Sequence, residues 1–273
     1  MLLTRAEMTF DFGGARLELE RDRELLRFTM SQFLYGEVTG IQCGHWLHHA
    51  PDLEAARFFA RQSVEELAHV MQFREILAIL GCAPQPPNRL IRFLSTGFIG
   101  GRFEEHVALE MAQGEGFVLM VLYALIDLVG EPRIRHILEA ATVQEERHVS
   151  FGEERTIRAV AARPALARHL LGLNLVSLLA MRRFGDRVVG RLAGRDHPVM
   201  RQLPAFLRRT TEVTELRLRR LGLLDRPLAE VGDFARAGLI AGALARRAAA
   251  RLAFFRRPRL LTDTYLDDPL LRG

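Results

Sequence analysis

Two Glu-x-x-His motifs carry the side chains of this sequence best suited to hold a metal ion. They are Glu66 with His69, and Glu145 with His148. Residues three apart on a helix lie on one face about one turn apart, so a carboxylate and an imidazole at this spacing can bind one ion. By itself the motif is a weak signal, because a chain with nine His and many Glu contains such pairs by chance.

Two further glutamates stand alone in apolar stretches. Glu37 is the only acidic residue between positions 25 and 51, and Glu115 is the only one between positions 111 and 126. A carboxylate buried on an apolar helix face is costly unless a partner compensates its charge. Both glutamates are therefore candidate metal ligands.

The elements that must position these residues are four helices, predicted from apolar residues at helical spacing. Their approximate ranges are 22–49, 52–81, 102–129 and 132–162. Short connections make the first two helices one antiparallel hairpin and the last two another. Each hairpin then presents a lone glutamate and, 29 or 30 residues later, a Glu-x-x-His motif at the same depth.

The link between the hairpins, at about 82–101, is long enough to cross the length of a helix. A helix of about 29 residues is roughly 44 Å long. An extended chain covers that distance in roughly 13 residues. A single long crossover of this kind is a feature of ferritin-like four-helix bundles.

The pattern resembles the ferritin-like di-iron carboxylate proteins, in which two helices each give one Glu and two others give Glu-x-x-His. The segment from Glu145 to Gly152 is similar to the fourth-helix motif of bacterial di-iron oxygenases, where an acid often precedes the first Glu; here that position is Gln144. The spacing is most similar to that of aldehyde-deformylating oxygenases. The resemblance covers about residues 21–160.

An all-α fold in three parts follows. We expect an N-terminal arm with a turn at Phe12-Gly13-Gly14, a ferritin-like four-helix bundle, and a helical C-terminal extension. The three parts are residues 1–20, 21–163 and 164–273. The extension is predicted to form helices at Ala165–Leu192, Met200–Leu221 and Leu228–Phe255.

The resemblance implies a site for two iron ions, although manganese, a mixed Mn/Fe pair and zinc stay open. Glu66 and Glu115 are the candidates to bridge both ions, and Glu110 is the alternative to Glu115. The nearby acids Glu65, Glu146, Glu153 and Glu154 are expected to be solvated or to support the ligands. The implied ligands of one ion are Glu37, Glu66 and His69, and those of the other are Glu115, Glu145 and His148.

Such a site predicts a non-haem di-iron enzyme that uses O2 and an electron-donor protein to oxidise a small, apolar organic substrate. Three other functions remain open: iron handling or peroxide removal as in ferritins and rubrerythrins, hydroxylation of a tRNA base, and a metal-free interaction scaffold. The chain lacks the CxxC pair of a rubredoxin-type electron carrier. The expected substrate pocket is lined by Phe33, Leu34, Met111, Val118 and Leu122.

The net charge of +5 conceals two parts of opposite sign. Residues 1–154 hold 14 Arg against 23 acids, a balance of −9, and residues 155–273 hold 24 Arg against 10, a balance of +14. The arginines of the second part, such as Arg217, Arg219 and Arg220, fit either an ordinary solvated surface or contact with an anionic membrane or an acidic carrier protein. No interleaving of aromatic and basic residues typical of RNA platforms occurs, so nucleic acid is not an expected partner.

Two features of the N-terminal half of the chain concern the location of the protein in the cell and a possible channel. The two cysteines form no CxxC pair and the first ten residues hold no apolar signal core, which favours the cytoplasm. His45, His48 and His49 end the first predicted helix beside Trp46. They form either a surface cluster or the lining of a channel.

Overall fold

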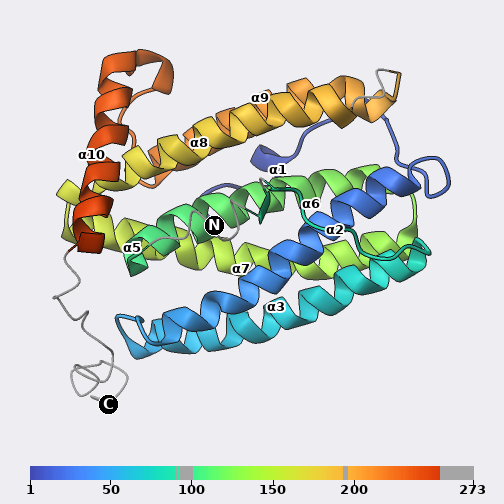
Figure 1. Ribbon diagram of the computed structural model, residues 1–273, viewed down its shortest axis with the longest axis horizontal. Coiled ribbons are helices and arrows are strands. Elements are labelled where there is room, and N and C mark those ends of the chain that lie inside the picture. The colour runs from blue at the N-terminus through green and yellow to red at the C-terminus, as the bar shows by residue number, and fades with distance from the viewer. Residues whose placement is uncertain (90, 93–100, 193–195, 253–273) are drawn as a thin grey trace. The chain divides into compact units, whose positions relative to one another are not determined.

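All regular structure is helical in the residues that the computed structural model describes, which are 1–89, 91–92, 101–192 and 196–252 (Figure 1). No strand occurs among these residues, so the predicted all-α class is confirmed. The long helices are α2 (Arg23–Gly40), α3 (Leu53–Ile79), α6 (Gly116–Leu128), α7 (Pro132–Ala162), α8 (Ala165–Leu192), α9 (Pro198–Arg220) and α10 (Asp233–Leu252).

The chain divides into two units by its internal contacts. The hairpin unit begins at Glu18 and runs to Phe103, and the large unit joins Met1–Leu17 with Glu104–Ala253. The described part of the predicted C-terminal extension thus belongs to the same unit as α6 and α7. The predicted three-part division stays a prediction, and each unit is described by itself.

In the hairpin unit, α2 and α3 pack against each other as the predicted antiparallel pair. The α2 helix continues as a 3-10 helix, η1 (Ile41–Leu47). Asp52 then starts α3, because its side chain accepts a hydrogen bond from the Ala55 amide at 2.8 Å and satisfies one of the free donors of the first turn. Part of the predicted crossover, at residues 90 and 93–100, lies outside the described residues.

The large unit contains a π-helix where the sequence predicted a regular α-helix over residues 102–129. A short helix α5 (Phe103–His106) leads into η2 (Val107–Glu115), which then continues as α6. The π-helix packs on α7 at Gly152, where an added Cβ would lie 2.5 Å from Met111 Cβ and 2.7 Å from the Ala112 amide nitrogen. Only glycine fits at this contact between the two helices.

Replacing Gly152 with alanine is therefore expected to destabilise the protein by about 1–3 kcal/mol, because the η2 backbone must move to admit the methyl group. The midpoint of urea unfolding measures this change. Gly36→Ala is the matched control, since Gly36 lies inside α2 with nothing within 4 Å of an added Cβ. That variant should be stabilised by roughly 0.5–1 kcal/mol; equal loss in both variants would contradict the packing argument.

The C-terminal helices extend the large unit. Helices α8 and α9 lie side by side, and α10 packs against α8 (Figure 1). The predicted third helix begins later than expected, because residues Leu228–Glu230 form a separate 3-10 turn before α10. Its predicted end at residues 253–255 lies outside the described residues.

The N-terminal arm packs on this unit through a short helix, α1 (Arg5–Met8), and the predicted turn is present at Gly13 and Gly14, both with positive φ. Glu7 on α1 receives two hydrogen bonds from the Arg220 guanidinium, at 2.5 and 3.0 Å. This pair and the Thr4 amide lower the pKa of Glu7 to about 2. The carboxylate therefore attaches the arm to the end of α9.

This attachment should depend on pH in a defined direction. A carboxyl whose pKa is lower in the folded state contributes stability that is present above its unfolded pKa, about 4.5. That contribution is lost as the pH falls towards 2, the folded pKa of Glu7. The urea midpoint of wild type should be higher than that of Glu7→Gln at pH 6, and the two should converge near pH 2. A difference that stays constant with pH would contradict the proposed role of the Glu7 carboxylate.

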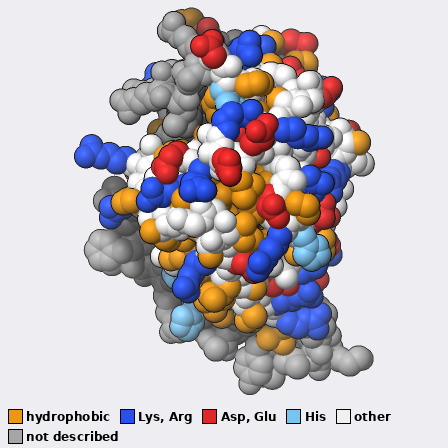
Figure 2. Space-filling view, turned by 90° about the vertical axis from the view of Figure 1, so that its right-hand side faces the viewer, with side chains coloured by type: hydrophobic (Ala, Val, Ile, Leu, Met, Phe, Trp, Pro, Cys, Tyr) orange, Lys and Arg blue, Asp and Glu red, His pale blue; other side chains and the backbone are white. Residues whose placement is uncertain are grey.

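The surface carries mixed charge on the face drawn in Figure 2, where arginine and acidic side chains lie next to each other among apolar ones. One helical stretch, Phe103–Leu128, is long and apolar enough to cross a membrane, and 67% of its most apolar window is buried, as is usual for a core helix. The cytoplasmic location stays a prediction.

Candidate metal centre

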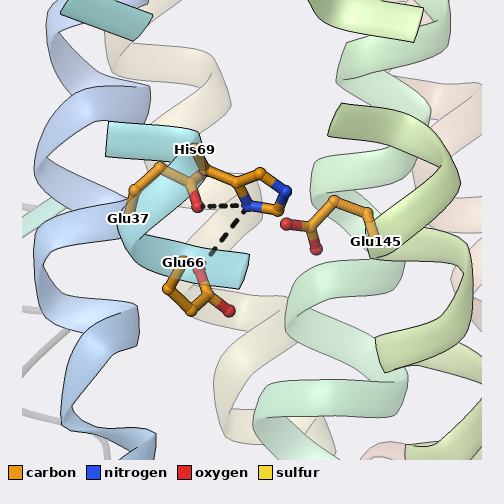
Figure 3. Close-up of side chains that lie close together, drawn as sticks. All are labelled: Glu37, Glu66, His69 and Glu145. Carbon is orange, nitrogen blue, oxygen red and sulfur yellow. Dashed lines mark hydrogen bonds and ion pairs between the residues drawn. The ribbon is translucent and has the colours of Figure 1, made fainter. Parts of the chain in front are cut away.

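The hairpin unit brings its three predicted ligands together. Glu37 projects from α2 towards Glu66 and His69 of α3 (Figure 3). Nδ1 of His69 lies 3.1 Å from Oε2 of Glu37 and 3.8 Å from Oε2 of Glu66. All three side chains are buried, and their ligand atoms lie within 4.8 Å of one another. One ion could contact all three.

Two neighbours that the sequence analysis did not single out hold Glu66 in this position. The Gln62 amide donates a hydrogen bond to Glu66 Oε1 at 3.1 Å, one helical turn before it. Across the hairpin, an added Cβ at Gly40 would lie 2.7 Å from Glu66 Oε2 and 2.9 Å from its carboxyl carbon. The glycine on α2 thus leaves room for the carboxylate.

Gly40→Ala is accordingly expected to displace the Glu66 carboxylate and to weaken metal binding by about 10- to 100-fold, as loss of supporting contacts around metal ligands does. Isothermal titration with Fe2+ or Mn2+ under anaerobic conditions measures the affinity. Gly36→Ala, four residues earlier on the same helix, is the control and should bind as wild type does. Unchanged affinity in Gly40→Ala would show that Glu66 moves aside without cost.

The large unit supplies the other three predicted ligands. On α7, Nδ1 of His148 lies 3.6 Å from Oε2 of Glu145, and both side chains are buried. Glu115 ends the π-helix, and a carboxylate oxygen of Glu115 lies within 4.8 Å of a ring nitrogen of His148. A π-helix widens the turn, and such turns occur often at functional sites.

The alternative ligand Glu110 has a different partner. Its Oε2 lies 2.8 Å from Nδ1 of His106 on the preceding turn, and its side chain is 30% exposed. Glu115 and His148 belong to a group of side chains that could hold an ion, whereas no such group among the described residues includes Glu110. This geometry favours Glu115 as the ligand.

The neighbouring acids differ in their environments. Glu65 pairs with Arg61 at 2.7 Å, and Glu146 accepts a hydrogen bond from the buried Tyr123 at 2.8 Å. Glu154, which is exposed, pairs with Arg158. Glu153 is not solvated as expected, because its side chain is only 2% exposed. It forms an ion pair with Arg217 of α9.

Comparison with protein families, curated proteins and solved structures gives no match to this chain. The chemistry of the site must be argued from its own residues. The observed feature is a set of Glu and His side chains, most of them buried, whose ligand atoms lie within 4.8 Å of one another, and they could hold a metal ion. A mixed set of imidazole and carboxylate donors suits iron, manganese or zinc.

Proposed function

We propose that the two sets of ligands form one carboxylate-bridged centre for two iron ions in a ferritin-like bundle, and that the protein is an O2-dependent oxidoreductase. The observation that carries the proposal is the buried arrangement of Glu37, Glu66 and His69 in one hairpin, matched in the other by the buried Glu145 and His148 with the half-buried Glu115.

Electrostatics supports a cation in the hairpin unit. The carboxylates of Glu37 and Glu66 both face the same nitrogen of His69 and both are buried. Ligand oxygens of the two carboxylates lie within 4.8 Å of each other. Two charged carboxylates this close repel each other, and burial disfavours their charged forms further, so a positive charge between them is needed to stabilise both. A divalent cation compensates both charges, and four carboxylates in all would balance two such ions.

The roles of the chain's own residues follow from chemistry. Glu66 and Glu115 would bridge the ions, while His69 and His148 each ligate one. When bound, the iron pair would supply the electrons that activate O2 for attack on a substrate. Transfer of one oxygen atom of O2 to an organic molecule, with reduction of the other to water, needs two electrons from outside the substrate, so a separate donor protein is part of the proposal.

The substrate would be small and apolar, because the residues expected to surround it are apolar. Val118 and Leu122 continue from the π-helix into α6, and Leu122 is buried. Phe33 of α2 stacks on Phe73 of α3 with ring centroids 5.1 Å apart, which fixes its ring against α3. We keep the arginine-rich C-terminal part as the region that would contact an anionic membrane or an acidic carrier.

Anaerobic loading with Fe2+ followed by exposure to O2 tests the proposal. The expected results are about two irons per chain, rapid O2 uptake, and a new near-ultraviolet absorption from an oxo-bridged di-ferric pair. Protein loaded with Zn2+ is the control and should take up no O2. Iron-loaded protein that is inert to O2 would overturn the oxidoreductase, and a large iron-storing cage would replace it with iron handling.

A further inference from the structure

Two histidines at the end of η1 lie together at a place that the proposed di-iron centre does not use. The rings of His45 and His49 have their centroids 4.9 Å apart at an angle of 50°. Both rings lie edge-on to Trp46, at 5.4 and 6.0 Å. The indole is 4% exposed and so anchors them, whereas His45 is exposed and His49 is half-buried.

The distance between the two ring centroids is the one expected for two imidazoles that bind the same metal ion. Two imidazoles that bind one ion at about 2.0–2.1 Å and a near-tetrahedral angle have centroids roughly 5 Å apart. Such rings must be neutral to ligate. Burial, followed by the nearby imidazoles of His45 and His48, lowers the pKa of His49 from its usual value, which favours the neutral ring.

We infer that His45 and His49 form a binding site for one divalent transition-metal ion on the hairpin unit. Two protein ligands leave the other coordination positions to water, so the ion exchanges with solution. Among divalent first-row ions, Cu2+ should bind most tightly and Zn2+ and Ni2+ less so. The inference uses none of the six proposed iron ligands and does not rest on the proposed function.

Trp46 provides a direct test, because it is the only tryptophan in the chain. A Cu2+ ion bound by the two neighbouring rings should quench its fluorescence. The full-length protein, stripped with EDTA, is titrated with CuSO4 at pH 7.5, and quenching plotted against free Cu2+ should follow a single-site curve, whatever the candidate metal centre takes up. Protons compete with the ion for the imidazole nitrogens, so the quenching should weaken as the pH is lowered.

The variants decide which residues bind the ion. His45→Ala/His49→Ala should raise the Cu2+ concentration at half-quenching by at least about tenfold. His136→Ala, an exposed histidine of α7, is the matched control and should leave the midpoint unchanged. Glu66→Ala should also leave it unchanged, which separates this site from the candidate metal centre.

Two outcomes would overturn the inference: wild-type quenching in the double variant, or quenching that disappears in Glu66→Ala alone. Circular dichroism checks that the double variant is folded. If it is not, the single variant His45→Ala replaces it, since His45 is exposed. An unchanged midpoint in that variant would overturn the inference as well.

Discussion

Truncating Arg217 to alanine is expected to destabilise the large unit by about 3–5 kcal/mol, because it leaves the buried carboxylate of Glu153 without its counter-charge. Arg217 is 1% exposed and Glu153 is 2% exposed, and Nε of the arginine lies 3.1 Å from the carboxylate. Arg217 also donates to Met8 Sδ at 3.0 Å, and Glu153 accepts from the Leu2 amide at 2.5 Å. The pair thus joins α7, α9 and the N-terminal arm.

Urea unfolding followed by circular dichroism measures the loss, with Arg219→Ala as the control on the same helix. Arg219 is exposed, so its truncation should change stability by less than about 0.5 kcal/mol. Replacing both partners, as Arg217→Met with Glu153→Gln, should recover much of the loss, because no unpaired charge stays buried. A double variant as unstable as Arg217→Ala would show that packing, and not charge, dominates.

The Arg217–Glu153 pair also shows where sequence reasoning fails. Periodicity of apolar residues predicted the helices because burial of one face dictates that spacing. For Arg217, Arg219 and Arg220 the sequence allowed a solvated surface or contact with an anionic membrane or an acidic carrier. Both alternatives place Arg217 at the surface, which is wrong because its side chain is 1% exposed. The partner of Arg217 lies 64 residues away in the sequence. No local pattern reveals a contact at that separation.

In the candidate site, too, local spacing predicted some features, and contacts between residues far apart in the sequence determine the others. The pairs within each hairpin follow from spacing, because i, i+3 residues share a helix face and a short turn sets the depth of the opposing helix. The π-helix that ends at Glu115 has no such signal, since one extra residue per turn depends on packing against α7 at Gly152. The hydrogen bond from the Gln62 amide to Glu66 could have been predicted from the sequence, because amide and carboxylate side chains at i, i+4 on a helix are known to interact.

Removing the Glu115 carboxylate tests the large unit's share of the metal centre and is the second large effect we expect. Glu115→Ala should lower bound iron from about two ions per chain to one or fewer, because a bridging carboxylate contacts both ions. Glu110→Ala, five residues earlier in the same π-helix, is the matched control and should keep its iron. Elemental analysis after anaerobic loading and desalting gives the iron content of both variants.

The comparison separates three explanations of the buried Glu and His side chains. Iron lost only in Glu115→Ala assigns the bridge as proposed, whereas iron lost only in Glu110→Ala transfers the role to Glu110 and breaks its contact with His106. Full iron content in both variants, with loss in His69→Ala, would confine metal to the hairpin unit. That result would leave no ion on the ligands of the large unit. It would remove the argument for a two-iron oxidase while leaving the hairpin's own metal site intact.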